Sequence, residues 1–370
     1  MIVISGLGFG GAERQVVELV NNSDPGKIDL RVCSLSAAVP LAAQLRDASR
    51  LHIIAKRGRY DLTVVARLAW YLRKQRIDIV HGWLFDAEIA AALAGRLARV
   101  RAVVGSERNT EYVFSSVQRL AYRLTRSCFD RIVANSEAGA AFNRRALGFA
   151  ADKYRVVRNG VDTGRFRPMD QRAARAALGL QESQPIIGMF ASFKQQKNHP
   201  LLLRAAQQVL LQYPGAQFMF VGGSIAGDWQ GSGAYAQEVC SLADTLGIAS
   251  ACRFMGTRED LPELYAACDL TVLPSLHEGT PNTVLESMAC ARPVVITDVA
   301  DNARVAPHGQ VGCIVPAGDQ QALAAAIVAL LNEPLRRAQL GQRARVWAEQ
   351  EFSLPALSSN MLAVYRELLV

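Results

Sequence analysis

The sequence predicts an α/β protein made of two doubly wound parallel sheets that face each other across a cleft. At 370 residues the chain is too long for one ordinary hydrophobic core and fits two domains of typical size. Short apolar runs alternate with amphipathic stretches along the chain, which is typical of buried parallel strands separated by helices. The alternation is interrupted at residues 159–184, which are rich in Gly, Arg and Gln, and then starts again. We therefore expect two Rossmann-like domains, 1–165 and 166–354, with their linker in the interrupted stretch.

Predicted strands and helices alternate in the first half. The strands are expected at Ile2–Ser5, Leu30–Ser34, Leu51–Ile54, Ile79–His81, Ala102–Ser106, Arg131–Ala134 and Arg155–Arg158. The helices are expected at Gly11–Val20, Asp61–Lys74, Asp86–Leu97, Ser116–Ser127 and Glu137–Leu147. Ligands of such sheets bind outside the carboxyl ends of the strands, so the functional loops should lie there, in the cleft.

The same pattern returns in the second half. The strands are expected at Ile186–Ala191, Phe218–Val221, Arg253–Met255, Leu270–Leu273, Pro293–Thr297 and Gly312–Val315. The helices are expected at Pro200–Gln212, Tyr235–Leu246, Leu261–Ala267, Thr283–Ala289, Gln320–Asn332 and Pro334–Glu351. A last helix, Pro355–Leu369, either continues the second domain or crosses back to the first.

Basic charge is concentrated in the first half. The chain carries a net charge of +8, yet residues 1–169 hold 27 Lys and Arg against 15 Asp and Glu, whereas residues 170–370 hold 14 against 18. A basic face suits anionic lipid headgroups, a lipid-linked pyrophosphate or nucleic acid, and a merely solvated face explains it as well. The sequence contains no recognisable nucleic-acid-binding module, so we expect no nucleic-acid partner.

Composition predicts a cytoplasmic protein without a metal cluster. Half of the residues are hydrophobic and a fifth are charged, as in ordinary soluble domains. No stretch approaches the roughly 18 to 20 apolar residues needed to span a bilayer. The chain's start resembles a strand that runs into a glycine loop rather than a signal peptide. The seven cysteines form no Cys-x-x-Cys pair, which favours scattered thiols in a reducing compartment.

A glycine-rich turn follows the first predicted strand. Residues 5–13 read Ser-Gly-Leu-Gly-Phe-Gly-Gly-Ala-Glu. Glycine lets the backbone approach a ligand closely, and the start of the next helix offers N–H groups to an anion. Gly10 and Gly11 are therefore candidate ligand-binding residues, although a structural turn explains the loop as well.

Two lysines follow the predicted strand Ile186–Ala191. Residues 192–199 read Ser-Phe-Lys-Gln-Gln-Lys-Asn-His, which places Lys194 and Lys197 at a strand-to-helix turn. Lysine side chains with helix amides behind them suit a doubly charged phosphate group. A solvated basic turn is the alternative.

The strongest signal follows the predicted strand Leu270–Leu273. Residues 274–286 read Pro-Ser-Leu-His-Glu-Gly-Thr-Pro-Asn-Thr-Val-Leu-Glu. A helix start can bind phosphate through its amides, and a carboxylate such as that of Glu278 or Glu286 can accept hydrogen bonds from sugar hydroxyls. A carboxylate near a helix N-terminus is also ordinary dipole chemistry, so Glu286 taken alone decides nothing.

The spacing of Glu278 and Glu286, with Leu-Pro-Ser before it and Arg-Pro after the next helix, resembles the signature of glycosyltransferase family 4. Gly10–Glu13, Val157–Asp162 and Lys197 resemble further segments of that family, so the resemblance covers nearly the whole chain. It implies a GT-B fold and a retaining, metal-independent transferase. It also implies a nucleotide diphosphate sugar as co-substrate and no cofactor.

The resemblance implies roles for the donor-site residues. Glu286 is expected to contact the nucleotide ribose, Glu278 to lie near the donor sugar, and Lys197 to hold the diphosphate leaving group. The segment Phe254–Arg258 is expected beside the base. The implied donor site comprises Gly10, Gly11, Ser192, Lys194, Lys197, Phe254, Gly256, Arg258, Glu278, Gly279, Thr280, Pro281, Asn282 and Glu286.

The sequence departs from the family pattern at one position. Many relatives carry a phosphate-binding arginine five residues before the lysine, and Ser192 stands there in this chain. Lys194 can supply a compact positive charge from a shifted position, but it does not reproduce the bidentate geometry of arginine. The departure concerns the detailed phosphate contacts and not the family.

The acceptor side is expected in the first half. His81 ends a predicted strand and can orient the acceptor or the donor sugar, although a buried structural histidine explains it as well. The candidate catalytic residues are Glu278, Lys197 and His81. The candidate acceptor-side residues are Glu107, Arg108 and Asn109.

Aromatic residues also lie close to arginines in the first half. Tyr112, Val113 and Phe114 come just before Arg119, Arg123 and Arg126. Such a combination suits an interfacial contact with a lipid-linked acceptor. A surface loop with a helix behind it explains the same residues without a membrane.

Together these features predict a glycosyltransferase that uses a nucleotide diphosphate sugar, with UDP as the expected nucleotide. We expect it to move a hexose or N-acetylhexosamine to a lipid-linked or polysaccharide acceptor in the synthesis of an envelope polysaccharide, such as lipopolysaccharide. The enzyme would work in the cytoplasm, in peripheral contact with the anionic inner face of the cell membrane. Two alternatives are a sugar-nucleotide epimerase of the same architecture and a non-catalytic sugar-nucleotide-binding protein.

Overall fold

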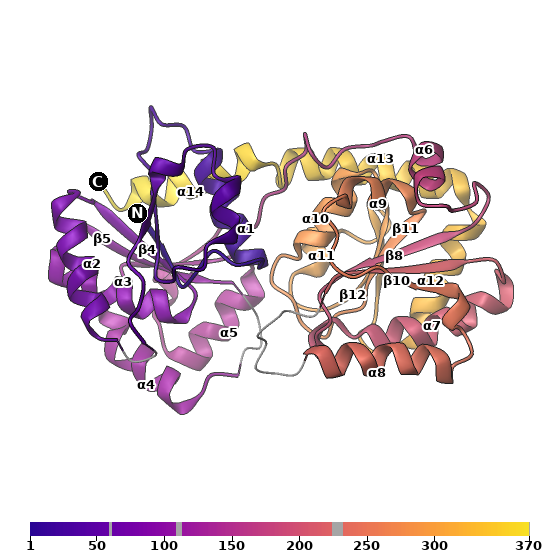
Figure 1. The fold of residues 1–370 in the computed structure, drawn as a ribbon, viewed down its shortest axis with the longest axis horizontal. Helices are drawn as coiled ribbons and strands as arrows, with labels where there is room; N and C mark the ends of the chain where they lie inside the picture. Colours follow the sequence, from indigo (N-terminus) through magenta and orange to yellow (C-terminus); the bar gives the residue numbers. More distant parts are fainter. Residues whose placement is uncertain (59–60, 109–112, 224–231, 370) are drawn as a thin grey trace. The chain divides into compact units, whose positions relative to one another are not determined.

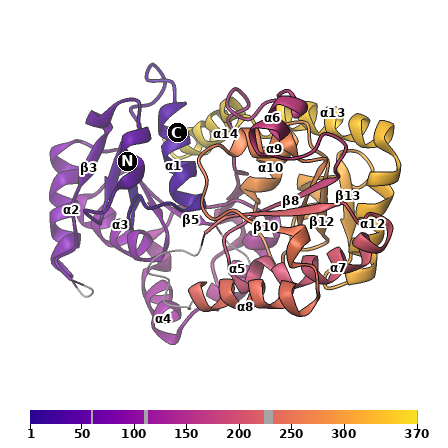
Figure 2. The same ribbon diagram turned by 45° about the vertical axis from the view of Figure 1, so that its right-hand side comes forward.

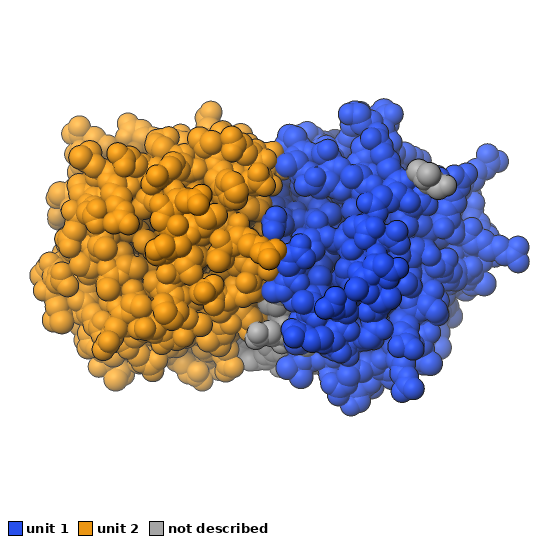
Figure 3. All heavy atoms as spheres, turned by 180° about the vertical axis from the view of Figure 1, so that it is seen from behind, with its two compact units in different colours: residues 1–160, 354–370 blue, residues 161–353 orange. Residues whose placement is uncertain are grey.

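The computed structural model describes residues 1–58, 61–108, 113–223 and 232–369. The chain forms two compact units, which Figure 3 shows in different colours and which are described separately below. Unit 1 comprises Met1–Gly160 and Leu354–Val370, and unit 2 comprises Val161–Ser353. Each unit is a parallel sheet covered by helices, so the expected α/β class is confirmed.

The described part of unit 1 contains a seven-stranded parallel sheet in the order β3-β2-β1-β4-β5-β6-β7. The strands are β1 (Ile2–Ile4), β2 (Val32–Ser34), β3 (Leu51–Ile53), β4 (Ile79–Trp83), β5 (Ala102–Glu107), β6 (Arg131–Ala134) and β7 (Tyr154–Val156). Side chains alternate between the two faces, so Ile2 and Ile4 enter one hydrophobic core while Val3 enters the other. The chain winds outward in both directions from β1 and β4, which form the topological switch point of a doubly wound sheet.

Helices cover both faces of this sheet. The core that contains Ile2 and Ile4 is closed by α1 (Gly11–Asn21) and α14 (Leu354–Glu367). The opposite face is covered by α2 (Thr63–Lys74), α3 (Phe85–Ala98), α4 (Ser116–Thr125) and α5 (Glu137–Leu147). Short 3-10 helices lie at Pro40–Gln44, Ala48–Arg50, Arg126–Cys128 and Ala151–Lys153.

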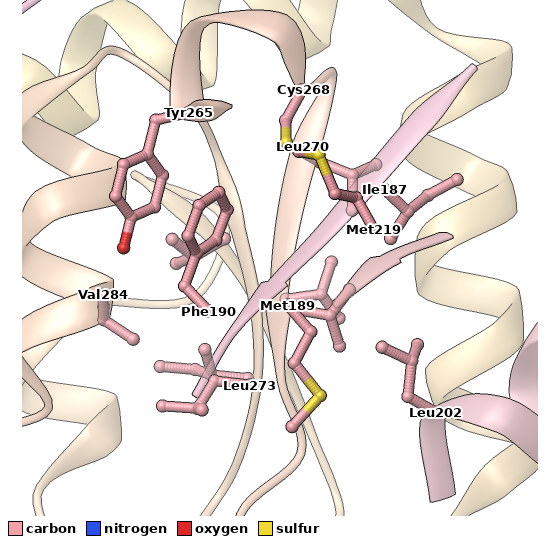
Figure 4. Close-up of a cluster of buried hydrophobic side chains, with 14 of the residues drawn as sticks. Ile187, Met189, Phe190, Leu202, Met219, Tyr265, Cys268, Leu270, Leu273 and Val284 are labelled. Carbon is pink, nitrogen blue, oxygen red and sulfur yellow. The ribbon is translucent and has the colours of Figure 1, made fainter. Parts of the chain in front are cut away.

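The described part of unit 2 contains a six-stranded parallel sheet in the order β10-β9-β8-β11-β12-β13. The strands are β8 (Ile186–Phe190), β9 (Gln217–Val221), β10 (Cys252–Phe254), β11 (Leu270–Leu273), β12 (Val294–Thr297) and β13 (Gly312–Val315). Its core includes Ile187, Met189 and Phe190 from β8 and Met219 from β9 (Figure 4). Here β8 and β11 form the switch point, so loops that follow these two strands are placed where ligands bind in such folds.

The helices of unit 2 also lie on both sides of the sheet. Figures 1 and 2 show α6 (Gln171–Ala177), α9 (Leu261–Ala267) and α10 (Asn282–Ala289) on one side. The other side carries α7 (His199–Gln212) and α8 (Ser232–Thr245). The remaining helices are α11 (Asn302–Val305), α12 (Gln320–Asn332) and α13 (Pro334–Glu351), with 3-10 helices at Gln195–Lys197 and Ala249–Ala251.

The border between the units differs from the predicted one. It lies between Gly160 and Val161, five residues before the expected position, and the last helix belongs to unit 1. Unit 2 begins and ends side by side, because the N–H of Val161 donates to the carbonyl of Phe352 at 2.7 Å. Most of the stretch expected as a linker is therefore part of unit 2.

The expected linker also contains a helix, α6, that the sequence analysis missed. Asp170 caps this helix by accepting hydrogen bonds from the N–H groups of Arg172 and Ala173 at 2.8 and 3.2 Å. The helix is fixed to the sheet by a buried ion pair between Arg175 and Asp269, at 2.8 Å. The buried residues of this helix are Ala174 and Arg175, so the sequence shows no apolar period there.

A buried carboxylate, that of Glu88 on α3, lies against the sheet of unit 1. Its Oε1 accepts from the N–H of Ser106 at 2.8 Å, and its Oε2 accepts from the hydroxyl of Tyr122 at 2.5 Å. Burial raises the pKa of Glu88 to about 7, because the charged form loses its hydration. The carboxyl group therefore keeps its proton in the folded state at pH values where it would lose it in the unfolded state.

This shift predicts that Glu88 lowers stability as the pH rises from about 4.5 to about 7. In that window the unfolded chain has released the proton while the folded chain still binds it, so the free energy of unfolding falls with increasing pH. A Glu88→Gln variant should lose this contribution, which amounts to about 3 kcal/mol over the window. Urea unfolding of both proteins at pH 5 and pH 7 measures the difference. If the free energies of unfolding of the two proteins differed by the same amount at pH 5 and at pH 7, the prediction would be contradicted.

Candidate functional site

Two loops of unit 2 meet at the carboxyl ends of β8 and β11. Residues 191–198 follow β8, and residues 274–281 follow β11 and lead into α10. Gln196 joins the loops: its side-chain amide donates to the carbonyl of His277 at 2.7 Å, and its carbonyl accepts from the N–H of Leu276 at 2.8 Å. The lysine-containing loop is thereby fixed beside the glutamate-containing loop.

Lys197 and Glu278, which the sequence places 81 residues apart, form an ion pair. The Nζ of Lys197 lies 2.5 Å from Oε1 of Glu278, and both side chains are largely buried. The buried hydroxyl of Ser275 donates to the same carboxylate oxygen at 2.6 Å. Because an ammonium group has three donors, this ion pair leaves Lys197 able to donate to phosphate oxygens as well.

Glu286 lies on α10 and is buried. Its Oε2 accepts a hydrogen bond from the hydroxyl of Tyr265 on α9 at 2.9 Å. The ring of Tyr265 stacks on Phe190 with centroids 3.8 Å apart, and Figure 4 shows the two rings side by side. Burial and the neighbouring Glu286 carboxylate raise the pKa of Tyr265 well above its usual value, so the hydroxyl keeps the proton that it donates.

The segment of residues 280–282, whose amides are expected to hold the diphosphate, leads into α10. Pro281 is the N-cap residue of this helix, and Asn282 is its first residue. The partial positive charge at a helix N-terminus favours an anion, and proline supplies no side-chain oxygen to cap the helix. The helix start, Lys197 and the two carboxylates thus belong to one unit and follow adjacent strands.

The residues expected beside the base lie at the end of β10. Phe254 stacks on Phe220 of β9, with ring centroids 4.9 Å apart, and Gly256 adopts a left-handed φ of 63°. The guanidinium of Arg258 pairs with Asp260 at 2.5 Å on the surface. A contact of this segment with a base therefore remains a prediction, and Arg258 has an acidic neighbour that would compete for it.

Ser192 and Lys194, the other two residues expected at the phosphates, lie in the loop after β8. The N–H of Lys194 donates to the carbonyl of Ser192 at 2.9 Å, which makes a tight turn. Both side chains are half-buried, and their phosphate contacts remain predictions. Burial and the nearby positive charge of Lys197 lower the pKa of His199 to about 4. This histidine is therefore neutral at physiological pH.

The geometry of His81 favours the structural alternative. It is buried on β4, its Nδ1 lies 2.8 Å from the hydroxyl of Tyr365, and its Nε2 lies 2.8 Å from the hydroxyl of Ser106. Both ring nitrogens are thus engaged within unit 1. Burial, with the nearby Arg108, lowers the pKa of His81 well below its usual value, so it is neutral. Its bonds fix α14 to the sheet, which explains the residue without a catalytic role.

Of the acceptor-side candidates, Arg108 is the most constrained. Its guanidinium lies over the ring of Trp83, 4.2 Å from the centroid, and donates to Oδ1 of Asn159 at 2.5 Å. Burial lowers its pKa to about 10, which leaves it charged at physiological pH. Glu107 ends β5, whereas Asn109 lies outside the described residues.

The glycine loop of unit 1 is confirmed as a strand-to-helix turn. Gly10 is the N-cap residue of α1, and Gly11 is its first residue. A side chain at Gly10 would collide with the carboxylate of Glu13, since an added Cβ would lie 2.0 Å from it. That carboxylate is the end of a flexible side chain, so the close approach does not by itself require glycine, and a contact of Gly10 or Gly11 with a donor remains a prediction.

Two family descriptions match the chain and together cover most of it. Residues 170–347 match Glycosyl transferases group 1, and residues 9–165 match Glycosyltransferase Family 4. The chain belongs to glycosyltransferase family 4. The expectation of a glycosyltransferase is thereby confirmed at the level of the family.

Curated relatives share about a third of their aligned residues with this family 4 chain. A D-inositol 3-phosphate glycosyltransferase of Rhodococcus erythropolis is 31% identical over 64% of this chain and 54% of its own length. Its counterpart from Segniliparus rotundus is 31% identical over 77% of this chain and 63% of its own length. The chain thus spans between half and two thirds of the length of these relatives.

Solved structures confirm the GT-B fold. HepE of Anabaena, solved in complex with UDP, is 22% identical, has a TM-score of 0.86, and is matched over 99% of both chains. The same protein was also solved with UDP-glucose, at a TM-score of 0.83. WaaG, described as a glycosyltransferase involved in lipopolysaccharide biosynthesis, is 16% identical, with a TM-score of 0.74 over 98% of this chain and 99% of its own.

The residues of this family 4 site that were missed from the sequence include Tyr265 and Gly222. Tyr265 lies in a seven-residue helix, where an aromatic side chain is indistinguishable from core packing until its partner Glu286 is placed. Gly222 follows β9 with a left-handed φ of 151°, and an added Cβ would lie 2.0 Å from the carbonyl oxygen of Ala191. A pair of glycines directly after the apolar run Phe218–Val221 was the available signal for this close approach to the lysine-containing loop.

Proposed function

We propose that this protein transfers a hexose or N-acetylhexosamine from a nucleotide diphosphate sugar, with UDP as the nucleotide, to a lipid-linked or polysaccharide acceptor. The ion pair between Lys197 and Glu278 carries the proposal, because it joins a cation suited to phosphate oxygens to a carboxylate suited to sugar hydroxyls at the switch point of unit 2. The UDP and UDP-glucose complexes of the structurally similar HepE support a nucleotide sugar as donor.

The proposed chemistry depends mainly on stabilising the leaving diphosphate. Lys197 and the N-terminus of α10 would neutralise the charge that develops on the leaving oxygens, which is the largest contribution expected in such a transfer. Glu278 would bind hydroxyls of the donor sugar or stabilise positive charge at its anomeric carbon. Glu286, oriented by Tyr265, would accept hydrogen bonds from the ribose. We further propose that the anomeric configuration is retained.

Thermal unfolding with a panel of nucleotide sugars tests the proposed donor. A ligand that binds only the folded protein stabilises it, by about 2.7 kcal/mol at one hundred times its Kd. UDP-linked sugars should therefore raise the Tm above that of the free protein, and the same sugars linked to GDP or ADP should raise it less. A Tm that responds equally to all nucleotides, or to none, would rule out the proposed UDP site.

Product analysis separates transfer from the alternative activities. With an acceptor present, a transferase should release UDP and extend the acceptor. A sugar-nucleotide epimerase would instead convert the donor to its epimer without any acceptor. A non-catalytic binding protein would bind UDP with no turnover. Chromatography of the nucleotide products, with and without acceptor, distinguishes the three outcomes.

The proposed transfer does not require a metal ion. The rate with saturating donor should therefore stay within about twofold after treatment with EDTA, because Lys197 and α10 supply the positive charge that a metal ion would otherwise provide. The measurement compares untreated, EDTA-treated and Mg²⁺-restored protein. A loss of activity in EDTA that Mg²⁺ restores would contradict this part of the proposal.

We also propose that the acceptor is presented at the anionic inner face of the cell membrane, in the synthesis of an envelope polysaccharide. The first 169 residues carry an excess of twelve positive charges, which suits anionic headgroups or a lipid-linked pyrophosphate. Among the described residues, no helix is long and apolar enough to cross a bilayer. A membrane contact would therefore be made by a surface of the protein.

A further inference from the structure

Helix α4 of unit 1 is stabilised by a cap at its N-terminus and by the packing of one of its faces. A capping box closes its N-terminus: the hydroxyl of Ser115 accepts from the N–H of Gln118 at 3.2 Å, and the side chain of Gln118 accepts from the N–H of Ser115 at 2.9 Å. Its inner face carries the buried residues Tyr122 and Thr125. Tyr122 packs against Phe85, Phe114 and Phe149. The helix is thereby held against the unit by one face only.

A second face of α4 exposes large aliphatic side chains in a row. We call this row the α4 stripe; its members, with their exposed fractions, are Val117 (74%), Leu120 (56%) and Leu124 (72%), and the exposed Val113 (88%) precedes the helix. The spacing of three to four residues places them on one side of the helix. Two more exposed leucines, Leu93 and Leu97, lie on α3, against which α4 packs. Single exposed apolar residues are common, whereas a continuous exposed row indicates a contact surface.

A third face of α4 carries only positive charge. Arg119, Arg123 and Arg126 are exposed and follow one another at the spacing of one helix side, next to the α4 stripe. Residues 113–129 contain these three arginines and no acidic residue. Phe114, which the sequence analysis offered as an exposed interfacial aromatic, is buried instead, and Tyr112 lies outside the described residues. The apolar contact would therefore be aliphatic rather than aromatic.

We propose that α4 docks unit 1 on an anionic bilayer surface, with the α4 stripe in the headgroup–acyl boundary and the three arginines at the lipid phosphates. An apolar row beside an exclusively basic row is the pattern of helices that lie in the membrane interface. Charge complementarity identifies an anionic bilayer as the partner of this surface, because each arginine close to anionic headgroups favours binding. The inference rests on the proposed function, because this surface would bring the proposed lipid-linked acceptor within reach of the enzyme.

Flotation with vesicles tests the proposed surface. The full chain should float with vesicles of phosphatidylglycerol and phosphatidylcholine, and binding should fall when phosphatidylglycerol is omitted or salt is raised. A Leu120→Glu/Leu124→Glu variant should lose binding at least 100-fold. An Arg119→Ala/Arg123→Ala variant should lose about 30-fold, at about 1 kcal/mol for each arginine removed.

Matched controls distinguish this surface from general hydrophobicity or charge. Leu211→Glu/Leu335→Glu replaces two leucines on α7 and α13 that are more exposed than Leu120 and Leu124, and Arg172→Ala/Arg343→Ala removes two exposed arginines of unit 2. Both controls should bind vesicles like the unaltered protein. Equal losses in the controls and the α4 variants would overturn the proposal, and so would vesicle binding that the α4 variants leave unchanged.

Two further measurements keep the inference separate from the proposed function. The Tm increase given by UDP should be the same in the α4 variants as in the unaltered protein, since the α4 stripe takes no part in the donor site. If UDP did not raise the Tm of the unaltered protein, that result would therefore count against the proposed function alone. Light scattering measures self-association, and a dimer that the α4 variants abolish without lipid would assign the surface to a second copy and overturn the membrane proposal.

Discussion

Replacement of Glu286 by alanine is expected to lower kcat/KM for sugar transfer about 100- to 10,000-fold. In the proposed site this carboxylate accepts hydrogen bonds from two ribose hydroxyls, each contributing about 1.5 to 3 kcal/mol because one partner is charged. Tyr265 orients the carboxylate with a 2.9 Å hydrogen bond. Initial rates at several donor concentrations measure the loss, and thermal unfolding shows that the variant still folds.

A ribose-specific readout separates this role from mere damage to the fold. The unaltered protein should discriminate against a donor that lacks the ribose 2′-hydroxyl, and the Glu286→Ala variant should not. A Tyr265→Phe variant should lose part of the discrimination, because the carboxylate loses its orienting donor. Glu182→Ala, which removes an exposed glutamate of unit 2, is the control and should behave like the unaltered protein. Unchanged discrimination in the Glu286 variant would refute the ribose contact.

Replacement of Lys197 by alanine is expected to lower kcat about 100- to 1,000-fold, or about 2.7 to 4 kcal/mol in the barrier. The ammonium group would donate to the leaving diphosphate, where negative charge grows as the glycosidic bond breaks. The side chain of Lys197 also forms an ion pair with the buried Glu278, at 2.5 Å, and its loss would leave that carboxylate without its cation. The stability of the variant must therefore be measured together with its activity. Single-turnover rates with saturating donor measure the effect on the chemical step.

Two variants make the result for Lys197 specific. Lys197→Arg keeps a positive charge and should retain more activity than Lys197→Ala. Arg172→Ala breaks an exposed ion pair with Glu182 in the same unit and should leave kcat unchanged, since exposed ion pairs contribute little. A Lys197→Ala variant that folds and turns over at nearly the normal rate would show that the diphosphate is held elsewhere.

Local signals were sufficient for most of the fold. The strand Leu270–Leu273 and the helix Leu261–Ala267 were predicted with the bounds that the structure has, because an apolar run and a helical period each extend over the whole element. The strand Ile79–His81 was predicted two residues too short, since Gly82 interrupts its pattern. The helix α6 was missed because its buried residues, Ala174 and Arg175, form no apolar period that the sequence could show.

The donor site was predictable in part because its motifs lie directly after strands. Neighbouring parallel strands end at one edge of the sheet, so Lys197 and Glu278 could be expected close together without knowledge of their contact. The partners Tyr265 and Ser275 could not be found in this way, because nothing in the local sequence distinguishes a buried hydroxyl with a carboxylate partner from an ordinary core residue. His81 shows the converse: its position at the end of a strand suggested chemistry, and its two hydrogen bonds in unit 1 favour a structural role.

A crystal structure with UDP tests most directly whether unit 2 binds the nucleotide as proposed. The account predicts diphosphate oxygens within hydrogen-bond distance of the Nζ of Lys197 and the N-terminus of α10. It also predicts the ribose hydroxyls at the carboxylate of Glu286. UDP bound at another place on unit 2, or in the same place with Glu286 directed away from the ribose, would contradict it.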